Sequence, residues 1–329
     1  MANCTNAPPT LPSDSGVAGI GVLLSFIITA VIALSISASL VFQEARGRAS
    51  PHKTSVLRRK LLNAYSDQQI LTGIGIQSVG LAKIDSMVPY HFFIIWMLSL
   101  LSMAVHNASL LALVHDFRRD WVLRWLRQFL IFVNLVLSSL YGIFILKAVG
   151  DGINDSTFPI ACVWETTDGT GQRSEDNHAL SFIGTIVVIA GNVVVFVLAT
   201  WYLHSRAQRF YKITQIVGLL LMTAISIGAI TRVSLLADAL GADHPVTLSD
   251  GGERQWSFGQ LLSVGMLLLP VVSIIEIIRG EIKCAPPVAD QGDDKTKLLG
   301  GDELQSYPEE RPSFQPNPFF GSQTNLFKK

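Results

Sequence analysis

The chain has 329 residues, of which 49% are hydrophobic and only 15% are charged, and its 25 basic residues balance its 25 acidic ones. Soluble globular proteins carry roughly 25% charged residues, so this deficit indicates a chain that folds in lipid. The neutral net charge provides no basic surface for nucleic acid, and we predict no nucleic-acid partner.

Seven segments are predicted to cross a bilayer as helices, because each approaches the ~20 apolar residues that a helix needs to span hydrocarbon. In chain order they are 17–42, 68–84, 90–114, 127–147, 179–203, 213–237 and 257–279. They form a predicted membrane domain over 17–281, between an external tail at 1–16 and a cytosolic tail at 282–329. The predicted fold class is therefore an all-α polytopic membrane protein.

The second segment, 68–84, is shorter and more polar than the others, and the charge pattern decides its assignment. No lysine or arginine precedes Arg46, and basic residues cluster after the first, third and fifth segments. Acidic residues dominate the connections at 151–176 and 238–253. By the positive-inside rule the basic connections are cytosolic, and the signs alternate correctly only if 68–84 crosses the membrane. We therefore expect seven spans, an external N-terminus and a cytosolic C-terminus.

The predicted external side carries features of the secretory pathway. Asn3 and Asn154 each begin an N-x-[ST] sequon and are predicted glycosylation sites. Cys4 and Cys162 lie on the same side, in an oxidising space where they either form a disulfide or remain unrelated thiols.

The C-terminal tail, 282–329, is rich in Pro, Gly, Asp, Gln and Ser and has no apolar periodicity, which predicts disorder. It contains DKTKLL, starting at Asp294, and Asn317-Pro318-Phe319, which resemble ligands of sorting and endocytic adaptors. These motifs favour adaptor partners and traffic beyond the endoplasmic reticulum. We expect the plasma membrane or endosomal and vacuolar membranes.

The sequence S-D-Q-Q from Ser66 to Gln69 fits a capping box and predicts that the second helix begins there. Helical spacing then places Gln69, Gly73, Gln77 and Gly80 on one face. Glycines let a neighbouring helix approach closely and glutamines hydrogen-bond across the contact, so this helix is predicted to lie centrally in the bundle.

Depth along the helices predicts where the polar groups meet. At ~1.5 Å per residue, Gln77 and His106 each lie about 13 Å from the cytosolic end of their helix, and Asn134 lies at a comparable level. We therefore expect a polar pocket in the cytosolic half of the bundle. The pocket residues are Gln69, Gln77, His106, Asn107 and Asn134, with Asp67 and Glu276 at the mouth.

The candidate catalytic residues are Asp67, His106 and Glu276, because ionisable side chains inside a membrane are functional candidates by default. The alternative interpretation is that the polar stripes only hold helices together. Nucleotide-binding glycine loops and clustered His or Cys ligands are absent from the sequence, so we predict no cofactor and no metal.

The run SDQQILTG from Ser66, followed by PYHFFIIW from Pro89 and by His106 before a basic connection, resembles a large group of fungal multi-pass membrane proteins. Those proteins carry an S-D-Q-Q-x-x-T-G signature and a Tyr-His pair, and the resemblance covers roughly 61–127. It implies a fungal source, while the biochemical role of that family is largely unassigned. In size and architecture alone, the chain is also similar to fungal membrane-bound terpene cyclases.

Two functions of different class are compatible with these features. The first is a metal- and nucleotide-independent membrane enzyme, resembling a terpene cyclase or isomerase, that acts on a lipophilic substrate in fungal secondary metabolism. Asp67 or Glu276 would then supply the acid. The alternative is a receptor-like seven-helix sensor, or a protein with a structural or trafficking role. Short cytosolic connections favour the enzyme, and the expected partners are a lipophilic small molecule and membrane lipids.

Overall fold

The computed structural model describes residue 4 and residues 10–46, 53–117, 121–150, 157–164, 175–204, 210–241 and 248–279. Within those residues every regular element is a helix, which confirms the all-α prediction. The predicted glycosylation sites Asn3 and Asn154 and the C-terminal tail lie outside the described residues.

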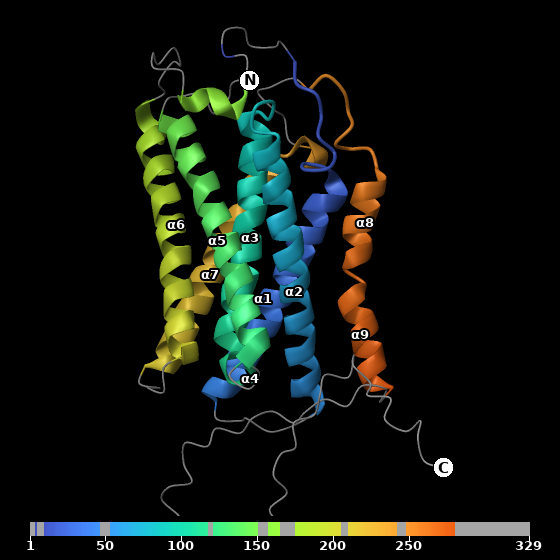
Figure 1. The fold of residues 1–329 in the computed structure, drawn as a ribbon, viewed down its shortest axis with the longest axis vertical. Coiled ribbons are helices and arrows are strands. Elements are labelled where there is room, and N and C mark those ends of the chain that lie inside the picture. Colours follow the sequence, from blue (N-terminus) through green and yellow to red (C-terminus); the bar gives the residue numbers. More distant parts are fainter. Residues whose placement is uncertain are drawn as a thin grey trace, which may run out of the picture. The chain divides into compact units, whose positions relative to one another are not determined.

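The long helices pack side by side as a bundle (Figure 1). They are α1 (Ile20–Ala45), α2 (Lys53–Ala82), α3 (Pro89–Ala112), α5 (Trp121–Gly150), α6 (Glu175–His204) and α7 (Tyr211–Leu236), followed by the shorter α8 (Phe258–Met266) and α9 (Leu269–Ile278). Three brief elements connect them: α4 (Val114–Phe117) and the 3-10 turns η1 (Ile160–Trp164) and η2 (Asp238–Leu240).

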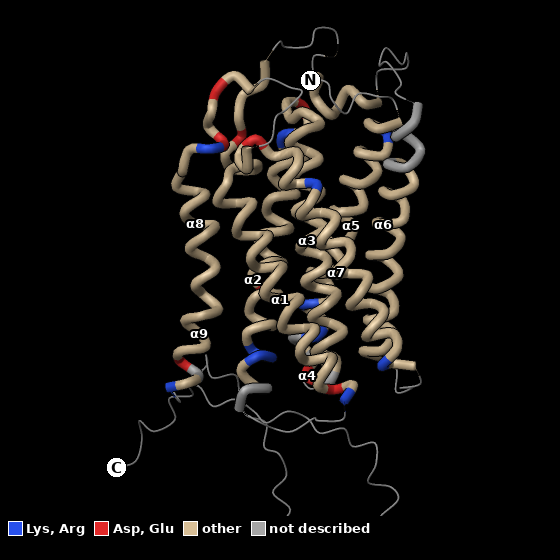
Figure 2. Tube along the Cα trace, turned by 180° about the vertical axis from the view of Figure 1, so that it is seen from behind, with Lys and Arg blue, Asp and Glu red and all other residues tan. Residues whose placement is uncertain are grey.

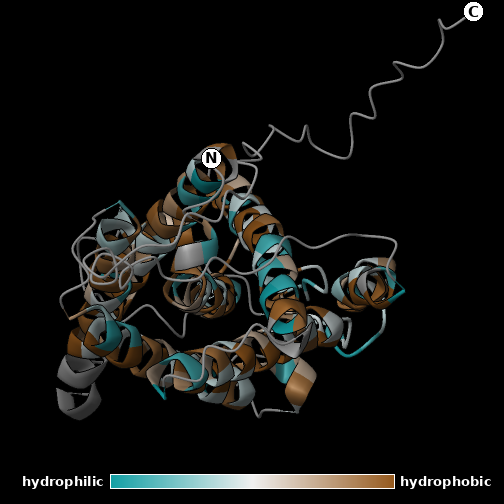
Figure 3. Ribbon diagram, turned by 90° about the horizontal axis from the view of Figure 1, so that it is seen from below, coloured by the Kyte–Doolittle hydropathy of each residue, from teal (hydrophilic) through white to brown (hydrophobic). Residues whose placement is uncertain are grey.

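Six helical stretches within the described residues are long and apolar enough to cross a membrane, and the protein is therefore embedded in a membrane as a multi-pass chain. They are α1, α3, α7, Arg124–Gly150 of α5, Phe182–His204 of α6, and Phe258–Glu276 across α8 and α9. Most charged residues gather at the two ends of the helices (Figure 2), and hydrophobic residues predominate along them (Figure 3). Many large apolar side chains of these helices are exposed, as is expected where lipid is the solvent.

Helix α3 forms the centre of the bundle and the α8–α9 pair its periphery. The apolar window of α3 is 100% buried, whereas that of Phe258–Glu276 is only 11% buried. Helix α3 packs against α1, α2, α5, α6 and α7, while α8 packs on α1 and α9 packs on α2. The last helix pair is consequently the part of the bundle held by the fewest neighbours.

Helix α2 begins earlier than the capping-box pattern predicts. It starts at Lys53, so Ser66 lies near its middle, and the prediction of a helix start at S-D-Q-Q is wrong. No proline or glycine occurs between Lys53 and Ser66, and nothing there interrupts helical hydrogen bonding. The Ser66 hydroxyl instead contacts the Ser109 hydroxyl of α3, at 3.0 Å.

The predicted single helix at 257–279 is two helices. Pro270 has no N–H to donate to the Met266 carbonyl, and its ring crowds that carbonyl, so α8 ends at Met266. The chain turns through 3-10-type bonds from the Leu268 N–H to the Gly265 carbonyl, at 3.0 Å, before α9 begins. The break divides a membrane-length segment near its middle.

Two glycines allow α2 to approach its neighbours closely. A Cβ atom on Gly73 would overlap the Ser102 hydroxyl of α3, and a Cβ on Gly80 would overlap the Tyr141 hydroxyl of α5. Gly75, by contrast, has no atom within 4 Å of such a Cβ. The first two positions lie on the buried face of α2, where side-chain volume is excluded by a polar group of the adjacent helix.

A segment before α1, which we call the N-terminal strap (residues 10–19), is tied to the loop that precedes α8. Leu11 forms an isolated bridge with Leu248, and the Ser13 N–H donates to the Asp250 carboxylate at 3.1 Å. Hydrogen bonds from the hydroxyl and the N–H of Ser13 lower the pKa of Asp250. Ahead of the strap, Cys4 forms a disulfide with Cys162 in η1.

Candidate functional site: a buried polar network and an adjoining cavity

His106 lies at the centre of a polar cluster between α2 and α3. Its side chain is fully buried, with Nε2 at 3.0 Å from the Ser102 hydroxyl and Nδ1 at 3.3 Å from the Ser66 hydroxyl. Among the described residues, its ring has no carboxylate partner. The imidazole is therefore held by two hydroxyl groups and has no counter-ion that would stabilise a positive charge.

Asn134 of α5 extends this cluster into a three-helix network. Its amide nitrogen donates to the Ser102 hydroxyl at 3.2 Å, and its amide oxygen accepts from the Gln77 side chain. The Gln77 amide also donates to the Gly73 carbonyl at 2.8 Å. The Tyr141 hydroxyl in turn donates to the main-chain carbonyl of Gln77 at 2.7 Å.

The network is a ladder along three helices and not a pocket at one depth. Ser66 and Gln77 are eleven residues apart on α2, which corresponds to about 16 Å. His106 contacts Ser66, so the prediction that Gln77 and His106 lie at the same depth is wrong. That prediction placed the start of the second helix at residue 68, whereas α2 starts at Lys53. Gln69 enters the ladder through its main-chain carbonyl, which accepts from Ser102 at 3.0 Å.

Asn107, which the sequence groups with His106, points to different helices. Its amide nitrogen lies 3.5 Å from the Asn192 oxygen of α6 and 3.4 Å from the Met222 sulfur of α7. Asn107 follows His106 by one residue, a turn of about 100° around the helix, so the two side chains lie on different faces of α3. Asn107 thus belongs to a second contact that joins α3 to α6 and α7.

The two predicted carboxylates do not join the network. Asp67 forms an ion pair with Arg127 of α5, whose guanidinium also donates to the Asn63 side chain. Glu276 is half-buried on α9, which packs against α2. Within the described residues, the ladder therefore contains one imidazole, hydroxyls and amides, and no carboxylate.

This composition suits helix association better than catalysis. Every member is buried, and hydroxyl–amide bonds across membrane helices each contribute roughly 0.6–2 kcal/mol. No group of three or more His, Cys, Asp or Glu side chains suited to a metal ion occurs in the described residues. The catalytic roles predicted for Asp67, His106 and Glu276 stay predictions.

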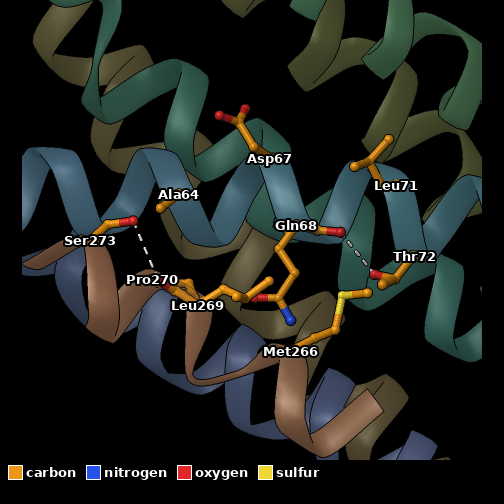
Figure 4. Close-up of a pocket in the computed structure, with 9 residues that line it drawn as sticks. All are labelled: Ala64, Asp67, Gln68, Leu71, Thr72, Met266, Leu269, Pro270 and Ser273. Atoms are coloured by element: carbon orange, nitrogen blue, oxygen red, sulfur yellow. Dashed lines mark hydrogen bonds between the residues drawn. The ribbon is translucent and has the colours of Figure 1, made fainter. Parts of the chain in front are cut away.

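A cavity lies on the opposite side of α2 from the ladder, against the break between α8 and α9. Its volume is about 470 Å³. The residues that line it come from the middle of α2 and from the α8–α9 junction (Figure 4). They are Ala64, Asp67, Gln68, Leu71, Thr72, Met266, Leu269, Pro270 and Ser273.

The polar side chains at this cavity differ in direction. Gln68 reaches from α2 towards Met266 and Leu269, whereas the Asp67 carboxylate points away from the α8–α9 junction (Figure 4). That direction agrees with the pairing of Asp67 with Arg127. The cavity therefore offers an amide to an occupant, within mostly apolar walls.

Sequence reasoning missed a second buried polar cluster, formed by Tyr90, His91 and Glu253 beside the N-terminal strap. Glu253 is fully buried; its carboxylate accepts from the Tyr90 hydroxyl at 3.0 Å and lies 2.7 Å from His91 Nε2. The Glu253 main-chain carbonyl accepts from the Ile20 N–H at 3.2 Å. The Tyr-His pair at the start of α3 was visible in the sequence, but its partner lies 162 residues further along in a loop without periodicity.

No protein-family model, curated protein or solved structure matches this chain.

Glu253→Ala should destabilise the protein far more than Arg254→Ala at the neighbouring position. Removing the carboxylate deletes its buried hydrogen bonds to the Tyr90 hydroxyl and the His91 ring, at a cost of about 1–3 kcal/mol for each bond. The Arg254 side chain is 57% exposed and pairs with Asp238, a surface pair worth about 0–1 kcal/mol. Unfolding of both variants in detergent measures the difference, and equal losses of stability would contradict the structural role of Glu253.

Proposed function

We propose that this chain is a seven-span membrane protein, with its N-terminus outside, that binds a lipophilic small molecule in the cavity between α2 and the α8–α9 junction. The cavity itself is the observation that carries the proposal. Its volume falls within the ~300–1,000 Å³ typical of small-molecule sites, and its walls are mostly apolar with a few directed polar groups.

The length and charge pattern of α2 support the seventh span. Its 30 residues extend for about 45 Å, more than the ~30 Å of hydrocarbon, and it runs alongside α1 and α3 (Figure 1). Its low hydropathy follows from the buried polar face that bonds to α3 and α5. Basic residues Arg58, Arg59 and Lys60 lie near its first end, which the positive-inside rule assigns to the cytosol.

Binding without catalysis is the function that the geometry favours. Asp67 is the one ionisable residue among those that line the described cavity, and its carboxylate is engaged by Arg127. A receptor-like sensor needs only the cavity and a helix that responds to its occupant, and the α8–α9 break supplies a natural hinge. The resemblance to the fungal S-D-Q-Q family is compatible with this proposal and assigns no activity.

A cyclase or isomerase in secondary metabolism is the second candidate. The observation that favours it is the position of Asp67 at the cavity, where release from Arg127 would present a carboxyl group to a substrate. Such an acid would protonate an alkene or epoxide in a site without metal or nucleotide.

Cysteine labelling on both sides of α2 tests the topology. In a Cys284→Ser background, Lys60→Cys and Ser86→Cys place exposed thiols just before and just after the apolar part of α2. A membrane-impermeant maleimide applied to intact cells should label the Ser86→Cys variant and spare the Lys60→Cys variant until the cells are permeabilised. Labelling of both variants in intact cells, or protection of both, would show that α2 does not cross.

Filling the cavity tests the binding proposal. Ala64→Phe adds a ring at the cavity wall, whereas Ala38→Phe adds the same ring to an exposed face of α1. Native mass spectrometry should find a lipophilic molecule on the wild-type chain and the Ala38→Phe variant, with at least a tenfold lower occupancy in Ala64→Phe. Equal occupancy in both variants would contradict binding in this cavity.

The two candidate activities are separated by comparing lipophilic metabolites in strains that carry the wild-type gene, a deletion or Asp67→Asn. An enzyme predicts that the same precursor accumulates in the deletion and in Asp67→Asn. A sensor predicts no accumulated precursor in either strain.

A further inference from the structure

The apolar walls of the cavity cannot by themselves choose between ligands that dissolve in a bilayer. Lipid tails are as apolar as Leu71, Leu269 and Pro270, so a tail that leaves the bilayer for the cavity gains little free energy from the exchange. Asp67, the ionisable residue of the lining, is already paired with Arg127. Selection of a ligand must therefore depend on polar groups at the edge of the cavity.

The two walls of the cavity run antiparallel. Ala64 of α2 and Ser273 of α9 line one end, whereas Thr72 of α2 and Met266 of α8 line the other (Figure 4). The start of α2 and the end of α9 consequently lie at the same end of the bundle (Figure 1). The proposed topology places this end in the cytosol.

Opposite charges lie one helical turn beyond this end of the cavity. Lys60 precedes Ala64 by four residues and Glu276 follows Ser273 by three, so helical spacing places each on the face that lines the cavity. Lys60 is exposed and Glu276 is half-buried, and neither forms an ion pair with a described residue. Charged residues are visible at both helix ends in Figure 2.

The arginines beside Lys60 bind other helices. Arg59 pairs with Asp116 of α4 at 2.9 Å, and Arg58 donates to the Ser39 hydroxyl of α1 at 3.3 Å. Lys60 is thus the member of this basic run that lies on the cavity face of α2. Basic residues between membrane helices on the cytosolic side are a recurrent feature of sites for lipid headgroups.

We infer that the molecule bound in this cavity is phosphatidylethanolamine from the cytosolic leaflet. An acyl chain lies in the cavity, the phosphate meets the Lys60 ammonium, and the ethanolamine ammonium donates to the Glu276 carboxylate. A short bridge joins phosphate and ammonium in this headgroup, which therefore presents both charges that the two walls require. This inference rests on the proposed binding function and specifies the chemical class of the ligand.

The test uses dioleoyl phosphatidylethanolamine, phosphatidylcholine and phosphatidylglycerol as probes, because they share tails and phosphate. The choline lipid keeps both charges but has no N–H to donate, and the glycerol lipid has no cation. The full chain is placed in nanodiscs with equal amounts of the probes, and native mass spectrometry measures the lipid that it retains. The wild-type chain should retain the ethanolamine lipid roughly three- to tenfold over either other lipid.

Substitutions at the two charges should have different effects. Glu276→Gln should lose most of the preference for ethanolamine over choline, because a neutral amide binds an ammonium group less strongly. Lys60→Gln should lower the retention of every probe and keep the ratio of ethanolamine to choline lipid, because the phosphate is common to both. The matched control is Lys212→Gln, which removes an exposed lysine near the start of α7 and should change neither quantity.

Equal retention of the probes by the wild-type chain, or a preference for phosphatidylglycerol, would overturn the inference. A preference that Glu276→Gln leaves unchanged would also overturn it. A lipophile that is retained without headgroup preference and lost in Ala64→Phe would reject this ligand class and leave the binding function standing. A wild-type chain that retains no lipophile would count against the proposed function and the inference together.

Discussion

The close contact of α2 with α3 and α5 is the constraint on which the rest of the structure depends. Inside a membrane, each polar group must find its hydrogen-bond partner within the protein. Ser102, Asn134 and Gln77 hydrogen-bond to one another across the three helices. The helices come close enough for these bonds because Gly73 and Gly80 carry no side chain. The buried face of α2 is thereby bonded to α3 and α5, while Gln69 Oε1 and Gln77 Oε1 have no partner among the described residues.

This attachment explains why the two faces of α2 have different roles. One face is fixed to the central helix α3, whose apolar window is completely buried. The other face meets α9, whose chain has few neighbours and begins at a proline break, and there a cavity remains. A rigid wall opposite a loosely held wall is the arrangement expected of a site that admits a ligand from lipid.

The sequence predicted the helical segments, the inward face of α2 and the polar stripes of α3 and α5, because period and composition are local properties. It misplaced the start of α2, since S-D-Q-Q has the chemistry of a cap but follows a segment without a helix breaker. The depth of Gln77 was wrong for the same reason. The cluster around Glu253 was not predicted because its partners are distant in sequence. The apolar run at 257–279 predicts one helix, although Pro270 within it divides the segment into α8 and α9.

Alanine substitution at three glycines of α2 tests the central claim most directly, through the free energy of unfolding in detergent. Gly73→Ala and Gly80→Ala should each destabilise the protein by about 1–3 kcal/mol, because a methyl group displaces Ser102 or Tyr141. Gly75→Ala meets no atom within 4 Å and should stabilise the helix by roughly 0.5–1 kcal/mol. Similar effects of all three substitutions would show that α2 is not held by close polar contact.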